Sequence, residues 1–321
     1  MLAPFRLRAQ GPLKAAVIGA GAFGRHHASK YRHLDGVELA AIADPSPEVR
    51  KIALATHGAP AVADWRELLG AVDLVSICTP AVTHAEIVRA FLNAGAHVLV
   101  EKPIATAVEE ADALIALASE TGRVLTVGHQ ERFVFAATGL LDHKAVPLDI
   151  SCWRNGPWSG RSTDVSVVLD LMIHDLDLMH QLVPFPVATV EARSRTLHSA
   201  FADEMHADIA FANGSVAHLE TSRISDARRR GMRAEYRDGV IEIDFITRKI
   251  RNTTPRPLKA LEQGDPLGES VLSFVRAVKD GVPTLVKPEE ARTALASALA
   301  IEDAADRART EPAYEAAAAA R

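Results

Sequence analysis

The stretch VLVEKPIAT, residues 98–106, places charged residues where an apolar run ends. Glu101 and Lys102 follow the apolar residues, and Pro103 fixes how the chain leaves the segment, with a cis Lys–Pro bond as one option. An ammonium group at the end of a strand suits contact with a cofactor or with a reacting oxygen. A pair of surface charges that ends a strand fits the same residues. The residues alone leave both interpretations open.

A second set of candidates lies in SVVLDLMIHDLDLMHQLV, residues 166–183. Asp170 and His174 are four residues apart, so a helix brings both side chains to one face. A histidine with a pKa near 6.5 exchanges protons readily at neutral pH. A solvated polar face is the plain alternative. A metal site that adds Asp177 and His180 is disfavoured because His180 points elsewhere on the helix, so we expect no metal.

The segment GAGAFGRHHA contains the glycine pattern Gly19-x-Gly21-x-x-Gly24 between an apolar run and a helix-like segment. Such glycines allow a tight turn, a close approach of pyrophosphate and close helix–strand packing, and the helix N-terminus favours phosphate. Asp44 ends the next apolar run, about 20 residues later. Its carboxylate would bind the adenosine ribose hydroxyls and repel a 2′-phosphate. The pattern therefore predicts NAD, with NADP disfavoured.

The elements that must position these residues alternate along the first half of the chain. Short apolar runs occupy residues 15–18, 37–44, 72–78, 97–100 and 124–129, with helix-like segments such as 84–95 and 107–122 between them. Continuously apolar strands separated by helices predict an α/β fold with a doubly wound parallel sheet. In the second half, Asn213-Gly214 and Asp238-Gly239 are hairpin signals, and helical patterns return at 269–281 and 287–308.

Length and composition restrict the class of protein. The 321 residues suggest about two domains, and no apolar run approaches the roughly 20 residues that span a bilayer. The formal net charge of −5 argues against nucleic-acid binding, and two cysteines make neither a disulfide framework nor a structural zinc site. We expect a cytoplasmic protein with a leader at 1–12, a cofactor domain at 13–130, a substrate and oligomerisation domain at 131–308 and a frayed tail at 309–321.

The segments GAGAFGRHHA, ICTPAVTH, AGAHVLVEKPIA and LDLMIHDLD, in this order and spacing, resemble the Gfo/Idh/MocA oxidoreductases, the glucose–fructose oxidoreductase and inositol dehydrogenase family. The resemblance spans about residues 14–308. It implies an N-terminal Rossmann domain and a C-terminal α/β domain with a large, mostly antiparallel sheet. The implied cofactor contacts are Gly19, Gly21, Ala22, Phe23, Gly24, Asp44, Thr79, Pro80, His84, Glu101 and Lys102. Ala81 departs from the asparagine of many members.

The same resemblance implies that Lys102, Asp170 and His174 are the catalytic residues. His174 would act as general acid/base on the substrate hydroxyl. Asp170 would orient the imidazole or bind a neighbouring hydroxyl. Lys102 would stabilise negative charge on the reacting oxygen. In some relatives the lysine is the base, and the sequence does not decide between these two assignments.

Arginines near the catalytic segment bear on the substrate. Arg154 and Arg161 lie in WRNGPWSGR, and a basic run follows at 228–230. Guanidinium groups suit phosphate or carboxylate, although a solvated basic strand fits 228–230 equally well. Residues 154–178 and 222–245 resemble the family branch that oxidises nucleotide-activated sugars, particularly UDP-N-acetylglucosamine 3-dehydrogenases. The alternatives are an inositol or free-sugar dehydrogenase and a non-catalytic NAD-binding sensor. We expect a homo-oligomer, a dimer or tetramer.

Overall fold

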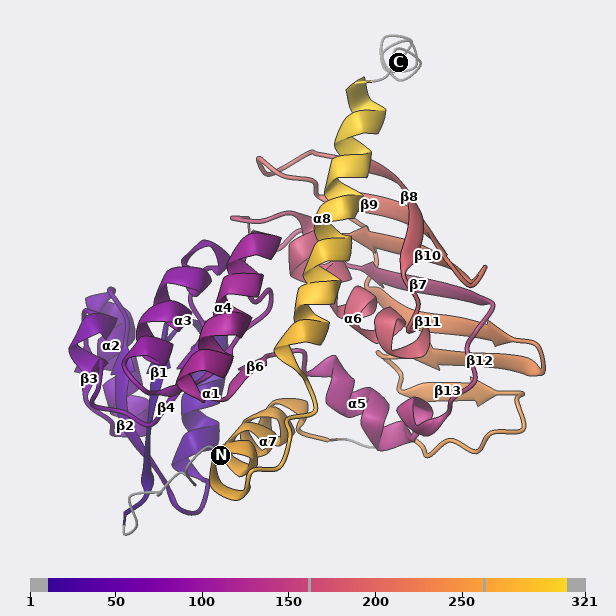
Figure 1. The fold of residues 1–321 in the computed structure, drawn as a ribbon. Helices are drawn as coiled ribbons and strands as arrows, with labels where there is room; N and C mark the ends of the chain where they lie inside the picture. Colours follow the sequence, from indigo (N-terminus) through magenta and orange to yellow (C-terminus); the bar gives the residue numbers. More distant parts are fainter. Residues whose placement is uncertain (1–10, 161–162, 262–263, 311–321) are drawn as a thin grey trace.

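The structure is a computed structural model that describes residues 11–160, 163–261 and 264–310. Its first half is a sheet of six parallel strands in the order β3-β2-β1-β4-β5-β6, with helices on both faces (Figure 1). The strands are β1 Leu13–Ile18, β2 Val37–Ala43, β3 Ala61–Val62, β4 Leu74–Ile77, β5 His97–Val100 and β6 Leu125–Val127. The helices are α1 Ala22–Arg32, α2 Pro47–His57, α3 His84–Asn93 and α4 Val108–Thr121. The predicted doubly wound sheet is confirmed.

The second half contains a sheet of seven strands in the order β13-β12-β11-β7-β10-β9-β8, in which only the β7–β10 pair is parallel. The strands are β7 Asp149–Asn155, β8 Val187–Arg195, β9 Glu204–Phe211, β10 Val216–Ser222, β11 Arg229–Tyr236, β12 Gly239–Asp244 and β13 Lys249–Asn252. Gly214, with φ +87°, turns the chain from β9 to β10, and Gly239 begins β12 after the other turn. Both predicted hairpins and the mostly antiparallel sheet are confirmed.

The helix that carries Asp170 and His174 is not regular along its length. A π-helical turn at Val168–Met172 precedes α6, Ile173–Leu182. Each residue in a π turn is rotated relative to its place in an α-helix, and such turns occur often at functional sites. The expected regular helix is therefore wrong in its first turn, the one that contains Asp170.

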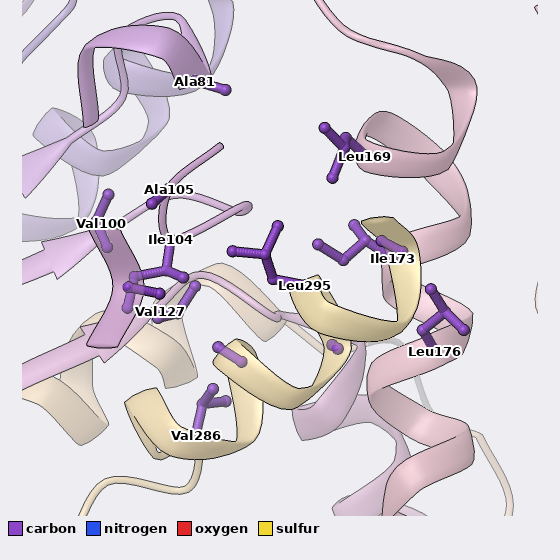
Figure 2. Packing of buried hydrophobic residues seen from close by; sticks show 14 of the residues in the cluster. Ala81, Val100, Ile104, Ala105, Val127, Leu169, Ile173, Leu176, Val286 and Leu295 are labelled. Carbon is purple, nitrogen blue, oxygen red and sulfur yellow. The ribbon is translucent and has the colours of Figure 1, made fainter. Parts of the chain in front are cut away.

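Two further helices connect the sheets. Helix α8, Pro288–Thr310, contacts α4 and β6 on one side and α6 and β8 on the other (Figure 1). Leu295 of α8 lies between Ile104 and Ile173, and these side chains belong to one apolar core that includes residues of both sheets (Figure 2). Because interiors are close-packed, this core fixes the two sheets relative to each other.

Helix α7, Pro266–Asp280, follows the second sheet in the chain but packs on the first sheet. Its Val271 and Phe274 share a second core cluster with Val17 and Tyr31. Helix α5, Glu131–Thr138, lies between the sheets in sequence. The domain boundary at residue 130 stays a prediction. Helix α7 shows that the chain returns to the first sheet after it has formed the second. Within the described ranges no helix has the length and hydropathy needed to cross a membrane.

Candidate active site

The glycine turn leaves room for a cofactor at one position only. A Cβ on Gly19, which has φ +84°, would lie 2.8 Å from the Cys78 carbonyl oxygen, and one on Gly24 would lie 1.8 Å from the Gly19 carbonyl oxygen. A Cβ on Gly21 would meet nothing within 4 Å. Packing therefore demands the first and third glycines, whereas the second faces open space at the N-terminus of α1. The turn fits a pyrophosphate held by free N–H groups.

Three further residues that we predicted as cofactor contacts are Ala22 and Phe23, in the first turn of α1, and Asp44, directly after β2. Ala22 and Phe23 are exposed there. The Asp44 carboxylate is fixed by backbone donors: Oδ2 accepts from the Ala20 N–H at 2.8 Å and Oδ1 from the Ser46 N–H at 2.9 Å. A carboxylate has about four acceptor sites, so both oxygens retain capacity for ribose hydroxyls. The predicted ribose contact fits this geometry.

Glu101 and Lys102, at the carboxyl edge of β5, do not pair with each other. The Glu101 side chain turns inward, where Oε1 contacts His27 Nε2 at 2.8 Å and Gln130 Nε2 at 2.7 Å. A Cβ on Gly128 would lie 2.6 Å from the same oxygen, so glycine is required beside it. Successive strand residues point to opposite sides, and Lys102 accordingly turns the other way. The surface pair that the sequence left open is wrong.

The loop after β4 and the segment that follows β5 are joined by hydrogen bonds of one histidine. His84, which begins α3, is buried, and its Nδ1 contacts the Pro103 carbonyl at 2.7 Å and its Nε2 the Thr79 carbonyl at 2.9 Å. Burial lowers the pKa of His84. The Lys102–Pro103 bond is cis. Pro80 is exposed beside Thr79, so this segment, which we predicted to contact the cofactor, faces outward at the edge of the sheet.

Lys102 reaches across to the second half of the chain. Its Nζ donates to the Asp170 carbonyl oxygen at 2.5 Å and contacts Asp170 Oδ1 at 3.0 Å. Both side chains are less than one-fifth exposed. The carboxylate thus contacts the ammonium group, whereas we had expected it to orient the imidazole or to bind a neighbouring hydroxyl. The structure brings Lys102 and Asp170 together from residues 68 positions apart.

His174, one turn further on, is half-buried. Its Nδ1 is buried and has no hydrogen-bond partner among the residues that the structure describes. Burial, followed by the charges of Lys102 and Arg154, lowers the pKa of His174 well below its usual value. The imidazole is therefore neutral at pH 7, as a base that accepts a hydroxyl proton must be.

Arg154 is an internal ion-pair partner. Its side chain is 2% exposed and donates two hydrogen bonds to Asp175, of 2.9 and 2.7 Å. Its Nη1 also lies 3.2 Å from Glu131 Oε1. Arg230 is paired with Arg154 across β11 and β7 and lies 3.5 Å from Glu131, but its side chain is 39% exposed. Arg161 lies outside the described residues. Arg154 is closed off from solvent, whereas Arg228 and Arg229 are exposed and Arg230 is partly exposed.

The remaining polar residues of α6 face the protein interior. Asp177 accepts two bonds from Arg132, at 2.9 and 2.5 Å, and His180 Nε2 contacts Ser297 Oγ at 2.8 Å. The solvated polar face is therefore wrong, because Asp177 is buried and Asp170 is paired with Lys102. No group of three or more His, Cys, Asp or Glu residues suited to a metal ion occurs within the described ranges.

Three residues around these groups were not predicted from the sequence: His27, His129 and Gln130. A usable signal existed for two of them. His129 and Gln130 directly follow β6, and the ends of neighbouring parallel strands meet at one edge of a sheet. His27 becomes a neighbour of the site only through tertiary contacts, such as its contact with Glu101.

Comparisons with known proteins agree with this arrangement. Residues 13–129 match the family model "Oxidoreductase family, NAD-binding Rossmann fold", and residues 141–242 match the "GFO/IDH/MocA C-terminal domain". The chain is 33% identical to the UDP-N-acetylglucosamine 3-dehydrogenase of Acidithiobacillus ferrooxidans over 90% of this chain and 96% of that one. A solved structure of that enzyme superposes with a TM-score of 0.87 over 93% of this chain and 99% of that one.

An inositol 2-dehydrogenase/D-chiro-inositol 3-dehydrogenase of Halalkalibacterium halodurans is 30% identical over 58% of each chain. Both family models fall on the two sheets described above, and together they cover more than half of the sequence. This chain belongs to the Gfo/Idh/MocA family of NAD-binding oxidoreductases.

Proposed function

We propose that this protein oxidises a secondary alcohol of a nucleotide-activated sugar, the 3-hydroxyl of UDP-N-acetylglucosamine, with NAD as the acceptor. The observation that carries the proposal is the likeness to the Acidithiobacillus ferrooxidans enzyme, which extends through both sheets. Charge supports it as well. Arg230 acts on His174 electrostatically and its side chain is 39% exposed, so an anionic group of the substrate can reach a cation near the imidazole.

In the proposed reaction His174 accepts the proton of the substrate hydroxyl. Its Nδ1 is buried, so Nε2 is the nitrogen left for the substrate. Lys102 donates a hydrogen bond to the same oxygen and stabilises the negative charge that develops there. Asp170 holds the ammonium group in place from the π turn. Lys102 as the base that accepts the hydroxyl proton, in place of His174, is the alternative assignment.

NAD, held by the glycine turn, Asp44 and the Thr79–Pro80 segment, supplies the hydride acceptor when it is bound. We propose NAD over NADP because the Asp44 carboxylate, fixed by Ala20 and Ser46, would repel a 2′-phosphate. The buried bonds of Glu101 to His27 and Gln130 keep the edge of β5 rigid. A rigid edge positions Lys102 beside the nicotinamide half of the crevice.

We propose Arg230, with Arg161, as the contact for the substrate diphosphate. Burial and the neighbouring Arg154 lower the pKa of Arg230. A phosphate group would relieve this crowding of cations. Arg154 would not contact the diphosphate itself, because its guanidinium group is bonded to Asp175. It would act through Glu131, which contacts both Arg154 and Arg230.

An inositol or free-sugar dehydrogenase is the second candidate, favoured by the likeness to the Halalkalibacterium halodurans enzyme. One screen separates the two: reduction of NAD, followed by absorbance, with UDP-N-acetylglucosamine, N-acetylglucosamine, UDP-glucose and myo-inositol as substrates and UDP alone as the control. Our proposal predicts turnover with the UDP-sugars and little with the free compounds. Turnover with myo-inositol alone would refute it.

We also propose a homo-oligomer in the cytoplasm. Helices α6 and α8 cover one face of the second sheet (Figure 1). The other face presents charged residues of both signs, among them Arg193, Asp208 and Glu235. Such a face is self-complementary when two copies meet about a two-fold axis. Light scattering in solution should give the mass of a dimer or tetramer, and a monomer mass at micromolar concentration would contradict the proposal.

A further inference from the structure

The residue of interest is His129, which follows β6 at the carboxyl edge of the first sheet. Val100 is paired with Val127 in the β5–β6 register, and Gly128 lies against the Glu101 carboxylate. Two positions beyond this pair are Lys102, after β5, and His129, after β6. The His129 ring lies edge-on to that of His174, with centroids 6.1 Å apart.

His129 is 1% exposed, yet neither ring nitrogen has a hydrogen-bond partner among the residues that the structure describes. A neutral imidazole carries one donor and one acceptor, and buried polar groups are almost always satisfied by protein or ordered water. The buried Nδ1 of His174 has the same deficit. Two neighbouring rings with unsatisfied nitrogens indicate a small polar group shared between them.

The surroundings of His129 are not those of a ring that only fills space. The charged groups that act on it come from three parts of the fold: Glu101 and Lys102 after β5, Arg132 of α5 and Asp177 of α6. The groups that act on His174 are Lys102, Arg154, His129 and Arg230. Burial lowers the pKa of both rings. Both are therefore neutral at pH 7, and each presents one nitrogen as an acceptor.

We infer that His129 is a positioning residue that fixes the tautomer of His174 through one buried water. The acceptor nitrogen of His129 binds the water, and the water accepts the Nδ1–H of His174. The hydrogen bond at one ring nitrogen decides which tautomer an imidazole adopts. Held in this way, His174 presents an unprotonated Nε2 to the substrate. The inference deepens the proposed function, since it concerns the base of the same reaction.

The test reads the tautomer directly and needs no turnover. Two-dimensional long-range ¹⁵N–¹H spectra of the ¹⁵N-histidine-labelled full chain should show His174 in the wild type as the Nδ1–H tautomer. His129→Phe, similar in shape but without an acceptor, should give a mixture of the two tautomers. His129→Asn, whose amide oxygen accepts a hydrogen bond, should restore the Nδ1–H form. A wild-type Nε2–H tautomer, or an unchanged tautomer in His129→Phe, would overturn the inference.

Activity gives a second reading. We expect His129→Phe to lower kcat about 10–100-fold, with KM for NAD unchanged and the acidic limb of the pH profile moved to lower pH, because an acceptor at Nδ1–H also stabilises the protonated ring. His129→Asn should keep most of kcat. His180→Phe, which replaces a half-buried histidine of α6 that contacts Ser297, is the control for the loss of an internal imidazole. A loss in His129→Asn as large as that in His129→Phe, or larger, would mean that the acceptor does not carry the effect and would contradict the inference.

Because the spectra require only the folded chain, an unexpected tautomer contradicts the role of His129 whatever the substrate is. A chain that reduces NAD with none of the sugars but shows the expected tautomers would leave the positioning role intact and refute the proposed function. The two failures are thus distinguishable.

Discussion

The edge of the first sheet and the segment around α6 meet at the same site but are built differently. At the sheet edge, Asp44 is held by backbone donors, and Glu101 is held by the side chains of His27 from α1 and Gln130 after β6. Around α6, the carboxylates are held by arginines from other elements, Arg132 of α5 and Arg154 of β7. The first region depends on sheet register, whereas the second depends on buried ion pairs. This difference predicts that substitutions in the two regions fail in different ways.

The largest effect should come from breaking a buried pair of α6. Asp177→Ala leaves Arg132, which is 1% exposed, with one partner fewer in the interior. Removing one partner of a buried pair costs about 3–5 kcal/mol of the free energy of unfolding. Urea denaturation measures this free energy of unfolding. The control is Asp208→Ala, which breaks an exposed pair with His218 and should change the same quantity by less than about 1 kcal/mol. Equal losses would mean that the buried pair of Arg132 and Asp177 contributes no more to stability than the exposed pair.

Removing the base affects chemistry and leaves the sheet edge intact. We expect His174→Ala to lower turnover at least about 100-fold. NAD affinity, measured by calorimetry, should stay close to that of the wild type because the glycine turn and Asp44 are unchanged. Unchanged turnover would remove His174 from the mechanism. A large loss of NAD affinity would mean that the two regions are not separate.

The opposite result is expected at the sheet edge. Asp44→Ala should lower the preference for NAD over NADP, measured as the ratio of kcat/KM values, by about 10–100-fold, the value of hydrogen bonds to a charged group. Turnover at saturating NAD should change little. A wild type that prefers NADP would contradict the role of Asp44.

The smallest effect is a shift of pH dependence. Burial and the nearby cations lower the pKa of His174, so the base stays neutral below pH 6.5 and the acidic limb of kcat/KM for oxidation lies below that value. Arg230→Gln removes one cation, which raises the pKa and moves the limb to higher pH by less than about one unit. Arg233→Gln, on the opposite face of β11, is the matched control. A limb that moves to lower pH would contradict the electrostatic argument.

The sheet edge was readable from the sequence because strand ends and glycine spacing place side chains through local rules. Asp44, Glu101 and Lys102 lie where the apolar runs end, and the structure places all three at the carboxyl edge. Strand alternation implies that Glu101 and Lys102 turn to opposite sides, but sequence spacing does not show which of the two faces the interior. That outcome depends on Gly128 of the neighbouring strand, which leaves space for the Glu101 carboxylate.

The α6 region was less predictable, for two physical reasons. The π turn at Val168–Met172 rotates Asp170 away from its helical position, so the i,i+4 spacing did not give the contact with Lys102. The buried ion pairs of Asp175 and Asp177 could not be predicted, because their partners, Arg154 and Arg132, lie 21 and 45 residues away in the chain. Pairings of this kind are properties of the packed fold and leave no periodic signal.

The central claim is that Lys102 of the sheet edge and His174 of α6 act on one carbinol oxygen. The most direct test is a crystal structure of the protein with NAD and the compound that turns over in the screen. Our account predicts that Lys102 Nζ and His174 Nε2 both lie about 2.6–3.2 Å from the same substrate oxygen. A substrate whose reacting oxygen contacts only one of the two, with the other side chain turned to a separate region, would contradict it.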